Sequence, residues 1–444
     1  MAAYSAEAGA GGGTTAGAAA AVSPPGFGYR WTIVALLFGA TTVNYIDRQV
    51  LGILAPTLTR EFHWSEADYA SIVSWWTLAY GCGLFFMGRF MDRVGVRRGF
   101  AAAVTTWSLA AMSHALVRTV AGFSAARACL GLGESGNFPG ALKAVTEWFP
   151  QKERAFAVGL YNAGSNVGVV TAAVLVPSIT LALGWRWAFI ATGTIDLLWL
   201  AVWLAVYRDP SRHRHVTQAE LDYIRSDPSD PPGTLPWRVW LGLLRRRQTW
   251  YYIVGKGMTD PVWLFYLFWL PKFLDSRWGV HLSGLALPLI VIYLAADFGS
   301  IAGGWLSTAL IKRGWSVNRG RKTAMLICAL LIVPTMFAPA AGSMWAAVGI
   351  VALAASAHQG WSTNLLTSPS DLFPSYAVGS VSGIGGAAGM GCAFLFQRYT
   401  GAILQATHGN YTPVFAVLGL AYLTALGLIH LLAPRMERAQ ITPA

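Results

Sequence analysis

The sequence predicts an all-α membrane protein with twelve transmembrane helices in two six-helix bundles and with both termini in the cytoplasm. The composition is the first observation, because 55% of the 444 residues are hydrophobic and only 12% are charged, against about 25% charged in a soluble domain. Second, apolar windows long enough to span a bilayer, about 20 residues each, recur twelve times. Third, the longest polar interruption, residues 208–249, divides these windows six and six.

The chain can therefore be divided in order. Residues 1–28 are rich in Ala, Gly, Ser and Thr and lack the charge of a targeting signal, so we expect a disordered tail. We further expect an N-terminal bundle (29–208), a cytoplasmic linker (209–249), a C-terminal bundle (250–434) and a C-terminal tail (435–444). The expected spans are 30–54, 68–90, 99–117, 120–142, 155–182, 186–207, 250–274, 285–311, 322–340, 343–367, 376–402 and 412–433.

One short helix is expected in the linker, where Thr217 precedes Glu220 by three residues in the pattern of a capping box. Positive charge predicts the orientation, because Lys and Arg concentrate in cytoplasmic loops. One set of loops is rich in them, around residues 89–98, 143–154, 208–247 and 312–322. The other set has few: Arg60, Arg118, Arg186, Lys272, Arg277 and Arg398.

This asymmetry accounts for the net charge of +12 without a nucleic-acid partner. The expected partners are membrane lipid and a small solute, and the chain is expected to be a monomer. The four cysteines lie in apolar runs with no metal-ligand spacing, so no metal site is predicted.

A motif of glycines and charges follows the second span. The glycines permit close helix approach, and the acid and the arginines could latch the two halves together on the cytoplasmic side. A merely basic loop would explain the arginines but not the aspartate or the glycine spacing. Small and basic residues at 303–322 echo the motif in the second half. The motif residues are Gly88, Asp92, Arg93, Gly95, Arg97 and Arg98.

Twelve spans, a central polar loop and weak similarity between halves indicate a transporter built from repeats, with its site at the midplane between them. Ionisable groups within spans are costly and are functional candidates by default. They are Asp47, Arg48, Arg127, Glu134, Asp196, Lys256, Asp260, Asp297 and His358.

Arg127 and Glu134 are seven residues apart and share a helix face. They are either a buried structural pair or a proton site, with Glu134 as the acid and Arg127 tuning it. Asp47 and Arg48 are adjacent, so their side chains diverge by about 100°. Unless they end the span and face water, Arg48 with Tyr45 can receive a carboxylate, and protonation of Asp47 would remove the charge that repels it.

Lys256 and Asp260, four apart, either neutralise each other or present Lys256 to the same solute from the second half. Span ten has a polar stripe that either satisfies a polar core or contacts solute. Its members in our candidate set are His358, Gln359, Asn364 and Ser368, together with Trp361. Further mid-span candidates are Tyr80, Tyr161 and Asn162. No role is evident for Asp196, Asp260 or Asp297.

The motif at 88–98 resembles that of the major facilitator superfamily. The segments "NYIDRQVLGILAPTL", "RACLGLGESGNFPGALKAVTEWFPQKERAFAVGLYNAGSNVG" and "ASAHQGWSTNLLTSPSDLFP" resemble its anion:cation symporter branch, and most of all bacterial hexuronate transporters. The similarity covers about residues 29–434.

The resemblance implies proton-driven import of a sugar acid such as glucuronate or galacturonate across the inner membrane, with the proton as coupling ion and no cofactor. It implies that Asp47 and Glu134 are the proton-coupling carboxylates, that Arg48 receives the substrate carboxylate and that Arg127 pairs with Glu134. Tyr45, Tyr80 and Asn162 fall at or near substrate-contact positions. Lys256 stands where related carriers have a basic residue, often Arg.

An enzyme is not expected, because the sequence contains no HExxH, GxSxG or Walker-type motif and no catalytic residues are assigned. Alternatives within transport are import or exchange of another organic anion, such as an aldonate, a dicarboxylate or an aromatic acid. A transporter-like sensor would share the fold, but the linker is too short for the extra cytoplasmic domain that such sensors carry.

Overall fold

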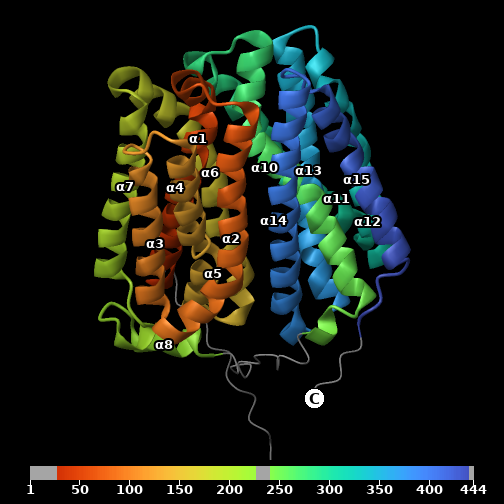
Figure 1. Ribbon diagram of the computed structural model, residues 1–444. Coiled ribbons are helices and arrows are strands. Elements are labelled where there is room, and N and C mark those ends of the chain that lie inside the picture. The colour runs from red at the N-terminus through yellow and green to blue at the C-terminus, as the bar shows by residue number, and fades with distance from the viewer. Residues whose placement is uncertain (1–27, 227–240, 440–444) are drawn as a thin grey trace, which may run out of the picture.

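Two bundles of long helices stand side by side in the computed structural model, which describes residues 28–226 and 241–439 (Figure 1). The expected N-terminal tail and part of the linker lie outside these ranges. The N-terminal half contains α1 (Arg30–Phe62), α2 (Glu66–Val94), α3 (Val96–Ser113), α4 (Val120–Glu134), α5 (Asn137–Trp148), α6 (Gln151–Leu183) and α7 (Trp185–Val206). The short η1 (Pro210–Arg212) and α8 (Gln218–Ile224) follow it.

The C-terminal half repeats this plan. It contains α10 (Arg247–Trp278), η2 (Leu282–Gly284), α11 (Ala286–Lys312), α12 (Val317–Ile332), η3 (Val333–Ala340), α13 (Met344–Leu372), α14 (Ser375–Ala406) and α15 (Thr412–Leu432). Each of the twelve expected spans is helical.

Two expected spans are interrupted. The span at 120–142 is divided at Ser135–Gly136 into α4 and α5. Pro139 explains the break, since it has no N–H to donate to the carbonyl of Ser135, four residues earlier. The span at 322–340 ends in the 3₁₀ turn η3, which contains Pro334 and Pro339.

Seven of the described helical segments are long and apolar enough to cross a membrane by length and composition alone. They correspond to α2, α6, α7, α11, α12 with η3, α14 and α15. Helix α1 does not qualify, yet it is buried along most of its length and contains Asp47 and Arg48. The buried charges Asp47, Arg48, Arg127 and Glu134 lie in helices that do not qualify, whereas the buried Asp196 lies in α7, which does.

The two halves meet at the end of the bundle opposite α8. There Lys272 of α10 pairs with Glu66 of α2 at 2.7 Å, and Arg60 of α1 pairs with Asp275 at 3.2 Å. The Tyr69 hydroxyl donates to the carbonyl of Phe268. Lys272, which the charge count placed in an exposed loop, is 6% exposed and lies between the halves. That assignment was wrong because Lys272 falls inside the expected span 250–274 and is a buried helical residue of α10.

Close backbone approach reinforces this contact. A Cβ at Gly52 of α1 would lie 2.7 Å from the carbonyl oxygen of Leu267 in α10. By contrast, a Cβ at Gly88, near the α8 end of α2, would meet no atom within 4 Å. The halves therefore touch closely at one end, while Gly88 lies in open space.

The linker helix α8 is fastened to the start of α1. The expected N-cap is present, since Thr217 accepts from the backbone of Glu220. The expected reciprocal bond is replaced, however, because the Glu220 carboxylate accepts from the backbone N–H groups of Tyr29 and Arg30 at 3.1 and 3.0 Å. These two N–H groups lie at the N-terminus of α1 and have no acceptor within their own helix, so Glu220 satisfies them, and the helix dipole also favours its negative charge there.

Candidate functional site

Arg48 forms the centre of a buried site in the N-terminal half. Its side chain, 5% exposed, donates from Nε to Glu134 of α4 at 3.1 Å and from Nη2 to Asn44 at 3.2 Å. Three aromatic rings surround the guanidinium, with centroids 4.3 Å (Tyr45), 4.7 Å (Trp76) and 4.8 Å (Tyr80) from Cζ. This is a desolvated cation held by one carboxylate and by aromatic faces. The alternative in which Asp47 and Arg48 end a span and face water is excluded.

Glu134 pairs with Arg48 rather than with Arg127, which corrects the expected pairing within α4. Its Oε2 also accepts from the indole N–H of Trp76 at 3.1 Å, whereas Oε1 receives no hydrogen bond from a described residue. Seven helical residues rise about 10 Å, so a neighbouring helix can reach Glu134 more directly than Arg127 does. Arg127 is fully buried, has no hydrogen-bond partner among the described residues and lies 5.3 Å from the Phe268 ring centroid.

Asp47 diverges from Arg48, as adjacency on a helix predicts. Its carboxyl group is turned toward α7, within interaction range of Asp196 and Thr192, and Arg127 is close enough to act on it electrostatically. Asp47 is 1% exposed. Neither of its oxygens accepts a hydrogen bond from the described residues.

Lys256 and Asp260 form an ion pair of 2.8 Å within α10. Mutual neutralisation, one of the two alternatives, is therefore present. The second is compatible with it, because the Lys256 ammonium is also within electrostatic range of Tyr80 in the opposite half. Since Tyr80 contacts Arg48, the two cations flank one tyrosine across the interface between halves.

The other tyrosines and Asn162 differ in their exposure. Tyr45 is partly exposed and packs edge-on against Phe138 of α5, with centroids 6.5 Å apart. Tyr161 is 3% exposed and packs against the same phenylalanine at 6.5 Å. Asn162 is exposed. Tyr45 and Asn162 are therefore accessible side chains, whereas Tyr161 is largely covered.

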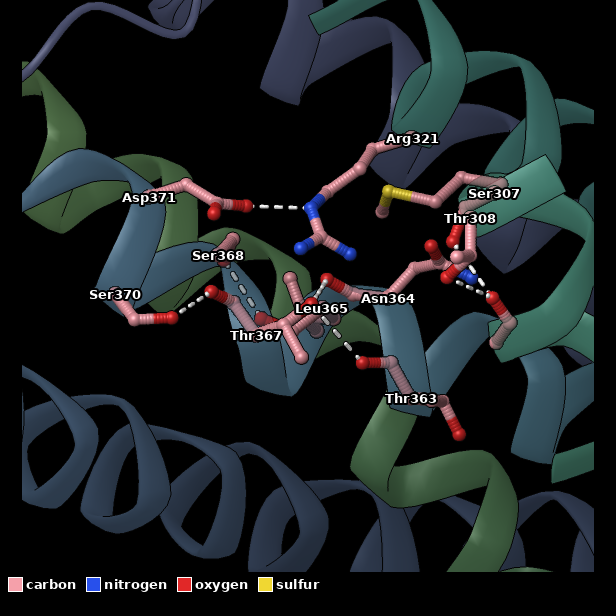
Figure 2. Close-up of polar contacts among 12 residues, drawn as sticks. Ser307, Thr308, Arg321, Thr363, Asn364, Leu365, Thr367, Ser368, Ser370 and Asp371 are labelled. Carbon is pink, nitrogen blue, oxygen red and sulfur yellow. Dashed lines mark hydrogen bonds and ion pairs between the residues drawn. The ribbon is translucent and has the colours of Figure 1, made fainter. Parts of the chain in front are cut away.

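Most polar side chains of the α13 stripe make hydrogen bonds within the C-terminal half. This matches the alternative in which the stripe satisfies a polar core. His358 stacks on Trp263 at 5.0 Å and hydrogen-bonds Tyr422. Asn364 donates to the carbonyls of Gly303 and Gly360 at 3.0 and 2.9 Å, and Ser368 donates to Leu365 in its own helix (Figure 2).

Trp361 is fully buried in the same half, with its ring 5.3 Å from Tyr422, while Gln359 is partly exposed. Figure 2 also shows the ion pair between Arg321 and Asp371, which joins α12 to α13 near the α8 end. Of the α13 candidates, Gln359 is the one not enclosed by its own half.

The motif between α2 and α3 differs from expectation in its glycines. Gly88 is in open space and makes no close helix contact. Gly95 has φ +84°, a backbone conformation that disfavours every residue with a Cβ, so its role is the turn itself. Arg97 donates to the carbonyl of Leu204 in α7, within the N-terminal half. Arg93 and Arg98 are exposed; the side chain of Asp92 lies outside the described part of the structure.

Three contributors to the site had no role assigned from the sequence. Asn44 and Trp76 had a signal, because each precedes a candidate by four residues, Arg48 and Tyr80 respectively, and so shares its helix face. Asp196 was noted as an intramembrane charge without a role. Nothing within α7 indicates its partner, because that partner is on α1.

The model of the major facilitator superfamily matches residues 37–397. The chain belongs to the major facilitator superfamily. It is 30% identical over 397 residues to a hexuronate transporter of Escherichia coli (strain K12), covering 88% of this chain and 91% of that protein. It is 31% identical over 310 residues to a galacturonate transporter of Dickeya chrysanthemi, covering 69% and 90%.

The fold of this chain resembles that of a transporter of known structure. An inward-open structure of the xylose transporter XylE from E. coli superposes with a TM-score of 0.69 at 15% identity, covering 91% of this chain and 97% of that one. This likeness and the family match confirm the expected twelve-helix fold in two bundles. The family match and the transporter relatives confirm the expectation of a multi-pass membrane transporter rather than an enzyme.

Proposed function

We propose that this protein is a proton-coupled symporter that imports a hexuronate, such as glucuronate or galacturonate, by alternating access. The supporting observation is the buried Arg48–Glu134 pair inside an aromatic shell. A guanidinium presents a planar fork of donors that suits a carboxylate, and the rings suit the faces of a sugar. Relatives named for hexuronate and galacturonate transport favour a monocarboxylate sugar acid.

Coupling follows from competition for one cation. In the described state the Glu134 carboxylate occupies Arg48, so a substrate carboxylate must displace it. A proton added at the unpartnered Oε1 of Glu134 removes the competing charge and leaves Arg48 available. This differs from our sequence interpretation, in which Asp47 alone governed Arg48; here Asp47 governs the α7 side of the cluster together with Arg127.

The remaining polar groups have supporting roles. Tyr45, Tyr80 and Asn162 contact the hydroxyl groups and ring of the substrate, Lys256 approaches it from the C-terminal half, and Gln359 is an additional contact. The described state, with its halves joined at the end opposite α8, is the inward-open one. The protein then lies in a bacterial inner membrane with its basic α8 end and both termini on the cytoplasmic side. Asp92 and its neighbouring arginines help to close that end in the other state.

The decisive experiment is uptake into proteoliposomes with an imposed pH gradient. The substrate panel contains glucuronate, galacturonate, galactonate, a dicarboxylic sugar acid and a sugar phosphate. We expect concentrative uptake of the hexuronates that collapses with a protonophore. Preference for the phosphorylated or dicarboxylic solutes would overturn the substrate assignment, and uptake driven by sodium without a pH gradient would overturn the coupling assignment.

Arg48→Lys tests the role of the fork. The variant keeps the charge but loses the geometry that serves Glu134 and Asn44 together, so we expect hexuronate uptake to fall by about tenfold or more. Arg60→Lys, at an exposed inter-half pair, is the matched control and should retain most uptake. Equal uptake by both variants would contradict carboxylate binding at Arg48.

A further inference from the structure

Asp196 lies behind Asp47 in a place where no solvent reaches it. It belongs to α7, is 0% exposed, and its Oδ2 accepts from the indole N–H of Trp107 in α3 at 3.0 Å. Its Oδ1 has no hydrogen-bond partner among the described residues. The carboxyl groups of Asp196 and Asp47 are within side-chain interaction range of each other, and both oxygens of Asp47 are likewise without a donor.

Two ionised carboxylates in contact inside a protein repel each other, and a proton held by one of them turns that contact into a hydrogen bond. Arg127 acts electrostatically on Asp47, whereas no cation of the described residues acts on Asp196, so Asp47 is the ionised partner and Asp196 holds the proton. Since the indole already occupies Oδ2, the hydrogen belongs on Oδ1 of Asp196 and points to Asp47. One donor then satisfies atoms on both residues that are otherwise buried without partners, which is costly.

The surrounding charges agree with one retained proton. The groups around the Asp47–Asp196 pair are Arg127 and Glu134 from α4, Arg48 from α1, which pairs with Glu134, and the Thr192 hydroxyl from α7, which donates to the carbonyl of Phe189 at 3.3 Å. If every group were ionised, three carboxylates would face two guanidinium groups. With one proton on Asp196, two negative charges face two positive charges, the arrangement that a low-dielectric interior favours.

We propose that Asp196 holds a resident proton throughout the transport cycle and donates it to Asp47 as a hydrogen bond. Asp196 is thus a positioning residue that orients the Asp47 carboxylate and stabilises its ionised form. Transported protons are then exchanged at Asp47 and Glu134. The transport readout of this inference rests on the proposed function; the protonation of Asp196 does not.

The protonation is tested by infrared spectroscopy of the purified protein in detergent. We expect the carbonyl band of a protonated carboxylic acid in the wild type at neutral and mildly alkaline pH, and its loss in Asp196→Asn. If the variant and the wild type have the same band intensity, Asp196 carries no proton and the inference is overturned. This result does not depend on whether any hexuronate is transported.

The hydrogen bond is tested by two nearly isosteric variants. Asp196→Asn keeps an N–H donor for Asp47 and should preserve the pH profile of uptake. Asp196→Leu has no donor, so the ionised Asp47 loses stabilisation and the midpoint of the profile should move to higher pH by about one unit. Coincident profiles for the two variants, both folded by size-exclusion chromatography, would overturn the positioning role. If the wild type shows no pH-driven uptake, the proposed function fails and the infrared result alone decides the protonation.

Discussion

Neutralising Glu134 should uncouple substrate binding from protons, because this carboxylate occupies Arg48 in the described state. At a separation of 3.1 Å and an effective dielectric constant of about 20, the attraction between the two charges is about 5 kcal/mol. This is an upper limit on the penalty that a competing substrate carboxylate meets, since the displaced groups regain other contacts. About a quarter of it corresponds to a tenfold change in affinity.

We therefore expect Glu134→Gln to bind hexuronate in mildly alkaline buffer about tenfold more tightly than the wild type. The amide is of the same size, and its oxygen can still accept from Trp76 and Arg48. Isothermal titration calorimetry in mildly acidic and mildly alkaline buffers measures the effect. The variant should show little pH dependence, should lose concentrative uptake and should retain exchange of substrate across the liposome membrane.

Glu61 provides a matched control. It also accepts from an indole, Trp185 at 2.6 Å, and pairs with an arginine, Arg186 at 3.6 Å, but it is exposed at the end opposite α8. Glu61→Gln should leave affinity and its pH dependence unchanged. If Glu134→Gln keeps the wild-type pH dependence and still accumulates substrate, the competition between Glu134 and the substrate does not occur.

Three further predictions concern the contact between the halves at Glu66 and Lys272, the turn at Gly95 and the linker residue His213. Glu66→Gln leaves Lys272 buried without its partner and should weaken the contact between halves by about 2 kcal/mol, less than for a fully buried pair because Glu66 is partly exposed. The distribution of spin-label distances across the end opposite α8 should broaden, and adding Lys272→Met to the same chain should restore the wild-type distribution. An unchanged distribution in Glu66→Gln would show that the Lys272–Glu66 pair does not hold the halves together. Gly95→Ala, at φ +84°, should lower stability by about 1–3 kcal/mol in thermal unfolding, whereas Gly88→Ala should have little effect; equal losses would remove the conformational argument. Burial lowers the pKa of His213 below its ordinary 6.5, so its contribution to stability is present above that value and is lost as the pH falls below it; hydrogen exchange in residues 210–226 should accelerate there, and His213→Gln should abolish that acceleration.

Much of the architecture was readable from local properties. The length and apolarity of the spans, the division at the polar linker and the glycine motif indicated the fold, because each depends on residues close together in the chain. The breaks at Ser135–Gly136 and at η3 were missed, although Pro139, Pro334 and Pro339 were a visible signal for them. Hydropathy windows average over such prolines and therefore join segments that backbone geometry separates.

Hydropathy along the chain was enough to place charges such as Asp47, Arg48, Arg127 and Glu134 within spans and so to predict their burial, because the spans must cross an apolar layer. For Asp47 and Arg48 the alternative of a water-facing span end stayed open until their burial was seen. The partners of these charges depend on how separate helices pack. Glu134 pairs with Arg48 of another helix, and Asp47 meets Asp196 on a third. Spacing along one helix fixes which residues share a face, whereas the rotation and lateral order of separate helices determine which faces meet, and neither is written in local sequence.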